Sequence, residues 1–327
     1  MNRWTPALAG VLLAMPLGLV ACGGSSSTSG GSGGGTSTAA CTPVKGQDLV
    51  VLKDDKSSQA ISAIVPIVRK EVAKPPLTTA LNNVTKSLTQ DKLVALNKAV
   101  STDNQRPEDA AKSYVQSNNL ATGLSGGSGP ITVASANFSE NQVLANIFAE
   151  TLNAAGYTAT VKVIGARALY EPALESNQAQ VVAEYVSNLV TFLADKDKTP
   201  NIKATGQIGP SMEALNQLLA KRQLVALEPS VATDEVAFAV SSGSAQKYGL
   251  KTISDVAAKC GGGITLGGPP ECHTRSDCQG ALESTYGLKI TGFTNLDEDG
   301  PFTRSSLKQG KVFMAEVFSS DPDLING

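Results

Sequence analysis

From residue 131 onwards, short apolar segments typical of strands alternate with amphipathic segments typical of helices. The strand candidates are Ile131–Ala134, Val161–Ile164, Val181–Ala183, Ala237–Val240 and Ile264–Leu266, and the helix candidates are Glu140–Ala155, Leu169–Glu175, Met212–Lys221 and Gly280–Tyr286. This alternation predicts an α/β architecture with mainly parallel sheets. In such sheets ligands bind beyond the carboxyl ends of the strands, where loops meet helix N-termini.

The composition argues against several classes of function. The formal net charge is −2, whereas nucleic-acid-binding proteins normally carry a basic patch. His273 is the only histidine among 327 residues, and no credible nucleophile–base pair accompanies it, so catalysis by a separate histidine base is disfavoured. Hydrophobic residues make up 41% of the chain, which is enough for a core. We expect a binding protein without enzymatic activity, cofactor or metal.

The N-terminal segment predicts export. Arg3 is followed by the apolar stretch Leu8–Val20, which is typical of a secretory signal. Leu19-Val20-Ala21-Cys22 resembles a bacterial lipoprotein lipobox, which implies removal of residues 1–21 and lipidation of Cys22. An ordinary signal with a chance cysteine is the alternative. Residues 22–43 are then expected to be a flexible tether, because 23–40 contain only Gly, Ser, Thr and Ala.

Four further cysteines, Cys41, Cys260, Cys272 and Cys278, remain after the lipidated one. An even number of cysteines in an exported chain is most simply read as two disulfides, and sequence alone leaves three pairings open. A metal site formed by Cys260, Cys272, Cys278 and His273 is the alternative. Adjacent Cys272 and His273 would not easily converge on one tetrahedral ion.

The second half of the chain resembles a known family, the substrate-binding proteins of quaternary-amine (glycine betaine, choline, carnitine) ABC importers. Ile131–Tyr157 resembles the family's first strand, S-x-N-F loop and first helix, and Pro172–Leu193 resembles its E-Y-[TS]-[GN] segment. Tyr248–Ala257, Pro270–Leu288 and Ser319–Leu324 resemble its second lobe. These segments occur in the same order as in the family.

Residues 49–120 resemble the C-terminal end of the same family, although here they precede its beginning. A circular permutation is the simplest explanation, with the linker 121–130 (ATGLSGGSGP) joining the usual termini and new termini opening between Leu324 and Leu49. An unrelated helical domain that matches by chance is the alternative.

The resemblance implies a circularly permuted, two-lobe, periplasmic-binding-protein-like (type II) α/β fold with a hinge and a central cleft. We expect residues 44–231 to form lobe 1 and 232–327 to form lobe 2, with one remaining crossing near Pro229–Asp234. A Cys41–Cys260 disulfide would then retie the lobes, and Cys272–Cys278 would bracket Arg275.

The resemblance also implies a set of ligand contacts. A quaternary ammonium has no N–H donors, so proteins hold it against aromatic faces, and a carboxylate on the same solute needs Arg, Lys or backbone N–H groups. Tyr185 matches a cleft tyrosine and Arg275 an arginine that meets the ligand carboxylate. The remaining candidates are Asn137, Phe138 and Ser139 before a helix N-terminus, and Tyr170, Asn188, Thr303, Arg304 and Phe318. The alternatives are that Tyr185 is a core tyrosine, that Arg275 forms a surface salt bridge and that Ser139 only caps the helix.

Three departures from the family pattern weaken the aromatic cage. Val236 stands where many relatives carry a cage tyrosine, Ala136 replaces a lysine, and the segment 302–304 lacks the usual tyrosine. These differences put glycine betaine itself in doubt, and Arg275 with Arg304 would suit another small polar or anionic solute.

The sequence therefore predicts a monomeric, lipid-anchored solute-binding protein on the outer face of the cytoplasmic membrane. Its expected partners are a small osmoprotectant-type solute and the permease of an ABC importer with its cytoplasmic ATPase. A sensory or accessory lipoprotein with the same fold is the alternative, and an exported enzyme is disfavoured by the lone histidine.

Overall fold

The structure, a computed structural model, describes residues 39–326. The expected signal peptide 1–21, the lipidation site Cys22 and the tether up to residue 38 lie outside the described residues. The last tether residues, 39–43, are held against the protein: Ala40 forms a β-bridge with Gly263, and Cys41 is disulfide-bonded to Cys260.

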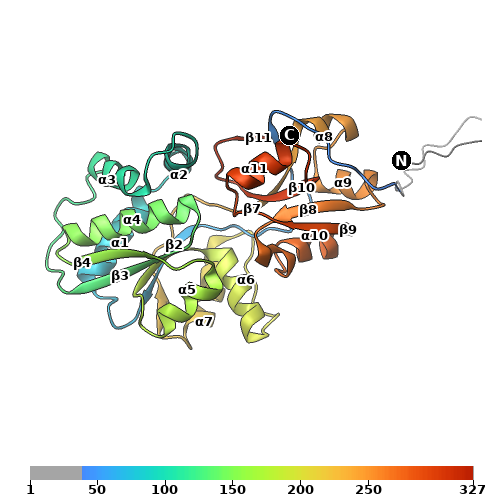
Figure 1. Ribbon diagram of the computed structural model, residues 1–327. Helices are drawn as coiled ribbons and strands as arrows, with labels where there is room; N and C mark the ends of the chain where they lie inside the picture. The colour runs from blue at the N-terminus through green and yellow to red at the C-terminus, as the bar shows by residue number, and fades with distance from the viewer. Residues whose placement is uncertain (1–38, 327) are drawn as a thin grey trace, which may run out of the picture. The chain divides into compact units, whose positions relative to one another are not determined.

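One half of the structure is built on a five-stranded sheet (Figure 1). Its order is β4 (Thr158–Val163), β3 (Pro130–Ser135), β5 (Val181–Tyr185), β2 (Ile64–Arg69) and β6 (Leu224–Ala226). β3 is parallel to β4 and β5, whereas β2 runs antiparallel to β5 and β6. The parallel part confirms the α/β architecture predicted from the alternation of strands and helices.

Helices cover both faces of this sheet, because alternate strand residues are apolar on both sides. In β2, Ile64 and Val68 point to one core, and Val65 and Ile67 point to the other. The first core is covered by α1 (Pro75–Ser87), α2 (Gln90–Asn97), a π-helical turn (Lys98–Thr102), α3 (Pro107–Ser117) and α4 (Ser139–Ala154). The second is covered by α5 (Arg167–Glu175), α6 (Val186–Asp197) and α7 (Ile208–Leu219).

The other half is built on a six-stranded sheet. Its order is β11 (Leu324–Asn326), β1 (Leu49–Leu52), β7 (Val236–Ser241), β10 (Met314–Phe318), β8 (Ile264–Gly268) and β9 (Ile290–Asn295). β7 is antiparallel to its two neighbours, and β8, β9 and β10 are mutually parallel. One core lies under α8 (Ser242–Tyr248), α9 (Ile253–Lys259), a 3₁₀ turn (Pro270–His273) and α10 (Gln279–Tyr286), and the other lies under α11 (Pro301–Lys308).

The position of β1 differs from the expected domain boundary. We expected residues 44–231 to form lobe 1, but β1 pairs with β7 and β11 in the six-stranded sheet. From here on, lobe 1 means the described residues 64–226, and lobe 2 means 39–52 together with 236–326. An apolar strand such as LVVL fits either sheet equally well, so its partner is decided by the fold and not by its own pattern.

The chain consequently crosses between the lobes twice, through residues 53–63 and 227–235, and not once as expected. The two crossings are hydrogen-bonded to each other, since Asp234 N donates to Ser62 O at 2.8 Å, and Ser230 N continues this pairing by donating to Ile64 O, at the start of β2, at 2.8 Å. Ala63 and Thr233 form an antiparallel bridge between them. The lobes are thus joined by a paired, two-stranded hinge.

Both expected disulfides are present, Cys41–Cys260 and Cys272–Cys278. The role expected for the first one is wrong, because Cys41 and Cys260 lie in the same core of lobe 2. This disulfide fastens the N-terminal segment to lobe 2 and does not tie the lobes together.

Candidate ligand-binding cleft

Two neighbouring cavities lie where the strands of both lobes end. The larger has a volume of about 550 Å³ and the smaller about 330 Å³, and they share Phe138, Ala166, Glu271 and Glu298 in their walls. The larger cavity is lined by the segments that follow β3 in lobe 1 and β8, β9 and β10 in lobe 2. The carboxyl ends of parallel strands therefore meet at this site, the position at which such sheets bind ligands.

The loop between β3 and α4 brings three predicted residues to the larger cavity: Asn137, Phe138 and Ser139. Asn141 holds this loop, since its Oδ1 accepts from Ala136 N at 2.8 Å and its Nδ2 donates to Ala183 O at 2.9 Å. No side chain caps α4, which begins at Ser139. Ser139 and Glu140, the first two residues of α4, both line the larger cavity.

The aromatic residues of the site form only one face. The ring of Phe138 lies 5.8 Å from that of Phe318 and 6.1 Å from that of Tyr185, measured between centroids. Tyr185 is 4% exposed and lines neither cavity, and its hydroxyl donates to Glu140 at 2.7 Å. Tyr170 lines the smaller cavity, but its hydroxyl donates to Glu184 at 2.7 Å. Burial raises the pKa of both tyrosines, so they remain neutral donors within lobe 1.

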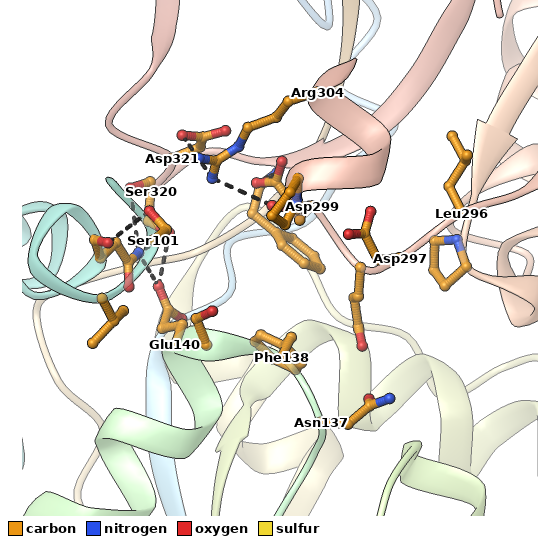
Figure 2. Close-up of a pocket in the computed structure, with 18 of the residues that line it drawn as sticks. Ser101, Asn137, Phe138, Glu140, Leu296, Asp297, Asp299, Arg304, Ser320 and Asp321 are labelled. Carbon is orange, nitrogen blue, oxygen red and sulfur yellow. Dashed lines mark hydrogen bonds and ion pairs between the residues drawn. The ribbon is translucent and has the colours of Figure 1, made fainter. Parts of the chain in front are cut away.

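A buried polar cluster joins the lobes at one side of the larger cavity (Figure 2). Glu140 of α4 accepts from Asn97 Nδ2, from Tyr185 and, at 2.8 Å, from Ser320 Oγ of lobe 2. Ser320 N donates to Asp234 at 2.9 Å. Burial raises the pKa values of Glu140 and Asp234, and the Glu140 carboxylate adds to the effect on Asp234.

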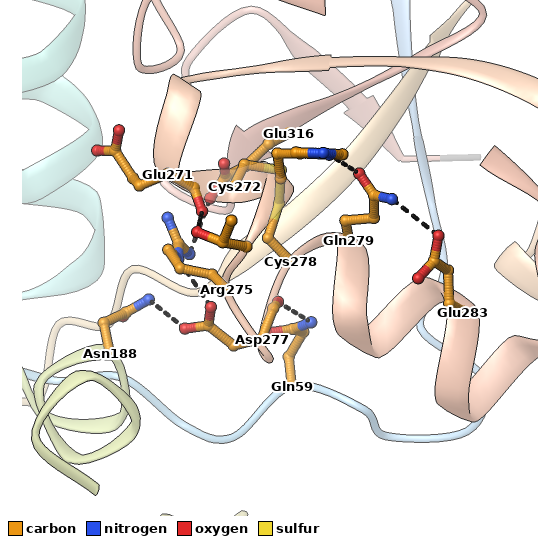
Figure 3. The surroundings of a disulfide bond; sticks show 12 residues. Gln59, Asn188, Glu271, Cys272, Arg275, Asp277, Cys278, Gln279, Glu283 and Glu316 are labelled. Carbon is orange, nitrogen blue, oxygen red and sulfur yellow. Dashed lines mark hydrogen bonds and ion pairs between the residues drawn. A yellow bond between two sulfur atoms is a disulfide. The ribbon is translucent and has the colours of Figure 1, made fainter. Parts of the chain in front are cut away.

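Arg275 lies in the wall of the smaller cavity, in the loop closed by Cys272–Cys278 (Figure 3). Its Nε donates to Asp277 at 2.8 Å, and its Nη2 lies 3.0 Å from Glu316 Oε1. Asn188 of α6 donates to Asp277 at 3.4 Å and accepts from Ser62 of the hinge at 2.7 Å. The predicted contacts Arg275 and Asn188 thus lie at the smaller cavity, where they belong to a network that joins the lobes.

Arg304 lines the larger cavity together with Phe318, whereas Thr303 is fully buried and lines neither cavity. Thr303 donates to Asp297 from both its amide and its hydroxyl, which fixes the start of α11. Arg304 forms ion pairs with Asp321 at 3.2 Å and Asp323 at 3.1 Å. The role of the predicted residues as ligand contacts stays a prediction.

Sequence reasoning missed the carboxylates that dominate the larger cavity. Its lining includes Glu140, Asp234, Glu271, Asp297, Glu298, Asp299 and Asp321, with Arg304 as the only basic lining residue in the described part of the chain. The sequence signal that could have located them is the acidic run Asp297-Glu298-Asp299-Gly300, which follows a segment of alternating apolar and polar residues. That segment, β9, was not recognised as a strand, so the run was not placed at a strand end.

Glu298 lies in the wall shared by both cavities, and its carboxylate makes no hydrogen bond or ion pair with the described residues. Burial, reinforced by Glu316 and Glu271, raises the pKa of Glu298 to about 8. Burial likewise raises the pKa of Glu316 to about 7, although Arg275 opposes this shift. Near neutral pH the site therefore holds carboxyl groups that are poised to change charge.

Two lobes joined by a paired hinge, with a cavity lined from both sides, define a hinged solute-binding protein. Comparison with protein families agrees with this class: the model described as "Substrate binding domain of ABC-type glycine betaine transport system" matches residues 38–117 and 129–326. The chain belongs to this family.

The individual proteins that this chain resembles share little sequence identity with it. The chain is 26% identical over 192 residues to a glycine-betaine-binding protein of Pseudomonas aeruginosa, an alignment that spans 56% of this chain and 60% of that protein. A crystal structure of a glycine betaine/carnitine/choline ABC transporter aligns with 18% identity and a TM-score of 0.38, over 58% of this chain and 68% of the other. No helix within residues 39–326 is long and apolar enough to cross a membrane.

Proposed function

We propose that this protein is the solute-binding subunit of an ABC importer. It captures a small organic ammonium compound, of the class that includes glycine betaine, choline and carnitine, and delivers it to a membrane permease. The cavity of about 550 Å³ that both lobes line carries this proposal, because a solute there contacts both sides of the hinge. Family membership supports the transport role.

Hinge closure is the proposed mechanism. Polar contacts between the lobes lie on both sides of the site: Ser320 with Glu140 beside the larger cavity, and Ser276 with Asp195 at 2.9 Å beside the smaller one. A solute that is bound between the lobes adds contacts that only the closed arrangement provides. Its binding energy therefore favours closure, and the closed form is the one expected to dock on the permease.

A solute screen tests the binding function. The purified protein would be titrated with glycine betaine, choline, carnitine, ectoine and proline while its thermal unfolding is followed. A solute present at a hundred times its Kd should add about 2.7 kcal/mol to the free energy of unfolding. Absence of any shift, confirmed by calorimetry, would argue against solute capture. Tight binding without solute uptake by cells would favour the sensory or accessory role.

We also propose that the protein is exported and anchored through a lipid on Cys22. The support is the lipobox-like sequence together with the 18-residue Gly/Ser/Thr/Ala segment 23–40, which would span roughly 20–25 Å as a flexible chain. Cys22→Ala should release the protein from the membrane fraction without altering solute binding. Retention of Cys22→Ala in membranes would exclude this anchor.

The circular permutation remains part of the proposal. The family match is interrupted at residues 118–128, which nearly coincide with the linker expected to join the usual termini. The segments proposed to flank the new opening are neighbours: β1 and β11 pair in parallel, with Leu49 opposite Leu324. Both observations support a rearranged chain order on an otherwise ordinary two-lobe fold.

A further inference from the structure

The two cavities together offer more space than a solute as small as glycine betaine requires. The volumes of about 550 Å³ and 330 Å³ each lie within the range of roughly 300–1,000 Å³ that is typical of pockets for drug-sized ligands. The cavities adjoin, because Phe138, Ala166, Glu271 and Glu298 stand in the walls of both. A solute that is bound beside Phe138 in the larger cavity therefore lies next to the smaller one.

The wall of the smaller cavity is largely apolar. It includes three short side chains, Ala136, Ala166 and Ala168, and two phenylalanines, Phe138 and Phe192. The alanines leave space between the lobes, and the phenylalanines offer apolar surface to whatever fills it. Phe192 belongs to α6 and is only partly buried, so its ring loses contact with water when the cavity is filled. Removal of such surface from water favours an apolar ligand group.

The neutral polar side chains of this wall already have partners within the protein. Asn188 donates to Asp277 and accepts from Ser62 (Figure 3), and the hydroxyl of Tyr170 donates to Glu184. An apolar group that packs beside them leaves these hydrogen bonds intact. A polar group would have to replace one of them in order to be satisfied itself.

The basic side chains of the same wall are paired with carboxylates. The pairs are Arg167 with Glu184, Lys196 with Glu171, and Arg275 with both Asp277 and Glu316. A carboxylate at the end of the solute would compete with these partners for the same cationic groups. A methyl or phenyl group would leave the pairs undisturbed, so the end of the solute that fits this cavity is uncharged.

We propose that the smaller cavity is a second subsite, which holds an uncharged apolar arm of a quaternary ammonium solute. The ammonium head lies in the larger cavity against Phe138 and Phe318, and the arm extends past Ala166 to Phe192. Quaternary amines that carry an alkyl, acyl or aryl chain have this shape. The inference rests on the proposed function, because it specifies the size and the end group of the solute for the same cleft.

A series of solutes that differ only in the chain tests the subsite. Calorimetry would compare tetramethylammonium with ethyl-, butyl- and hexyltrimethylammonium. We expect the affinity to rise about four-fold for each buried CH₂ group and to level off once the chain fills the cavity. The heat-capacity change of binding should become more negative along the series, because apolar surface is buried.

A matched pair of solutes tests the end group. γ-Butyrobetaine carries a carboxylate where butyltrimethylammonium has its terminal methyl group. We expect butyltrimethylammonium to bind at least about ten-fold more tightly, because the carboxylate would lose its hydration without gaining an unpaired cationic partner. Tighter binding of γ-butyrobetaine would mean that the smaller cavity accepts an anion beside Arg275, and the inference would be overturned.

Variants locate the arm. Thr191 of α6 lines the smaller cavity but not the larger one, so Thr191→Phe should occupy the subsite. It should weaken hexyltrimethylammonium about ten-fold or more and leave tetramethylammonium nearly unchanged. Phe192→Ala makes the opposite change: it removes apolar wall and should weaken the hexyl compound about five-fold or more.

Thr79→Phe is the matched control, because it places the same ring at an exposed position of α1 that lines neither cavity. Circular dichroism and thermal unfolding would show that each variant is folded. If Thr191→Phe weakens tetramethylammonium as much as the hexyl compound, the variant acts on the cleft as a whole, and the assignment of the arm to the smaller cavity is wrong.

The solute series also separates the inference from the proposed function. If choline or glycine betaine binds while affinity stays constant or falls with chain length, the inference is overturned and solute capture stands. If no quaternary amine binds at all, both fail.

Discussion

Arg275 shows how the surroundings of a residue decide its role. Its side chain is 17% exposed, whereas that of its partner Glu316 is only 1% exposed. The guanidinium bridges Asp277 and Glu316 and thereby compensates a carboxylate that has little access to water. The sequence context suggested a contact with the solute, but these distances indicate that Arg275 first of all stabilises lobe 2.

Arg275→Met should therefore destabilise the fold. At pH 8, loss of its partner should lower the free energy of unfolding by up to about 3–5 kcal/mol, the cost of leaving a buried charge unpaired, and by less where Glu316 takes up a proton. Denaturant unfolding measures the effect. The double variant Arg275→Met with Glu316→Gln should recover part of the loss. Unchanged stability combined with weaker solute binding would instead return Arg275 to the role predicted from sequence.

The raised pKa values of the site predict how stability depends on pH. Burial places the pKa of Glu298 at about 8 and that of Glu316 at about 7, both above their ordinary value. The folded protein then holds more protons than the unfolded chain between about pH 4.5 and pH 8. Stability from these groups is complete below the unfolded pKa and is lost as pH rises through the folded pKa. Burial shifts Glu140, Asp234 and Asp299 in the same direction.

We expect the melting temperature of the ligand-free protein to fall from pH 5 to pH 8. Differential scanning calorimetry across this range checks it. Glu298→Gln should reduce the fall across this range, and Glu213→Gln, which alters an exposed position of α7, should leave it unchanged. A melting temperature that rises across the range would mean that these carboxyl groups are ionised and compensated in the folded protein.

At the scale of elements, the sequence predicted several central helices and strands after residue 131, but not all of their partners. Short apolar segments identified β3, β5, β7 and β8. The sheet to which β1 belongs was missed, because its four apolar residues carry no information about register or neighbour. β9 was missed because its residues are half-exposed and include Gly292, which weakens a strand pattern.

The carboxylates that line the larger cavity were not predicted, for a related reason. Asp297, Glu298 and Asp299 are adjacent in sequence, and such runs usually lie on a solvated surface. Glu140, Asp234 and Asp321 are widely separated and meet only because both lobes direct their strand ends to one place. The pairing of Arg275 with Glu316 is equally non-local, since these residues come from a loop and from β10.

The Cys41–Cys260 disulfide allows a prediction about one element, the N-terminal segment. The bond closes a loop of 219 residues, and the chain-entropy model gives about 5 kcal/mol as the upper limit of its stabilisation. Replacing both cysteines by serine should lower the free energy of unfolding by up to this amount, measured by denaturant unfolding under non-reducing conditions. Solute affinity should be nearly unchanged, because both cysteines lie in one core of lobe 2.

The shorter disulfide provides the comparison. Cys272 and Cys278 are six residues apart and enclose Thr274, Arg275 and Asp277, which line the smaller cavity. Cys272→Ser with Cys278→Ser should cost less stability than loss of the long disulfide but weaken solute binding more. The reverse ranking would mean that Cys41–Cys260 does restrain the lobes after all.

At the scale of the whole molecule, the charge of the cleft and the contacts across it act on the same equilibrium. Glu140 and Asp234 are both buried beside Ser320 of lobe 2, which donates to Glu140 from its hydroxyl and to Asp234 from its backbone amide. The contact between the lobes thus depends on one serine placed between two acidic groups. A cation bound nearby would compensate negative charge on these groups, so closure and capture of a cation should favour each other.

Ser320→Ala tests this coupling. Removing the hydroxyl takes a donor from Glu140 and an acceptor from Asn97, both across the interface between the lobes. The ligand-free variant should sample more open arrangements, which small-angle X-ray scattering would detect as a larger radius of gyration. Affinity for the best solute should fall about two- to ten-fold, the equivalent of one net hydrogen bond of about 0.5–1.5 kcal/mol.

Ser284→Ala is the matched control, because this exposed hydroxyl bonds only to Gly280 of its own helix. If the two variants behave alike, the lobes are held by the paired hinge and by packing, and the Ser320 contact contributes nothing to closure.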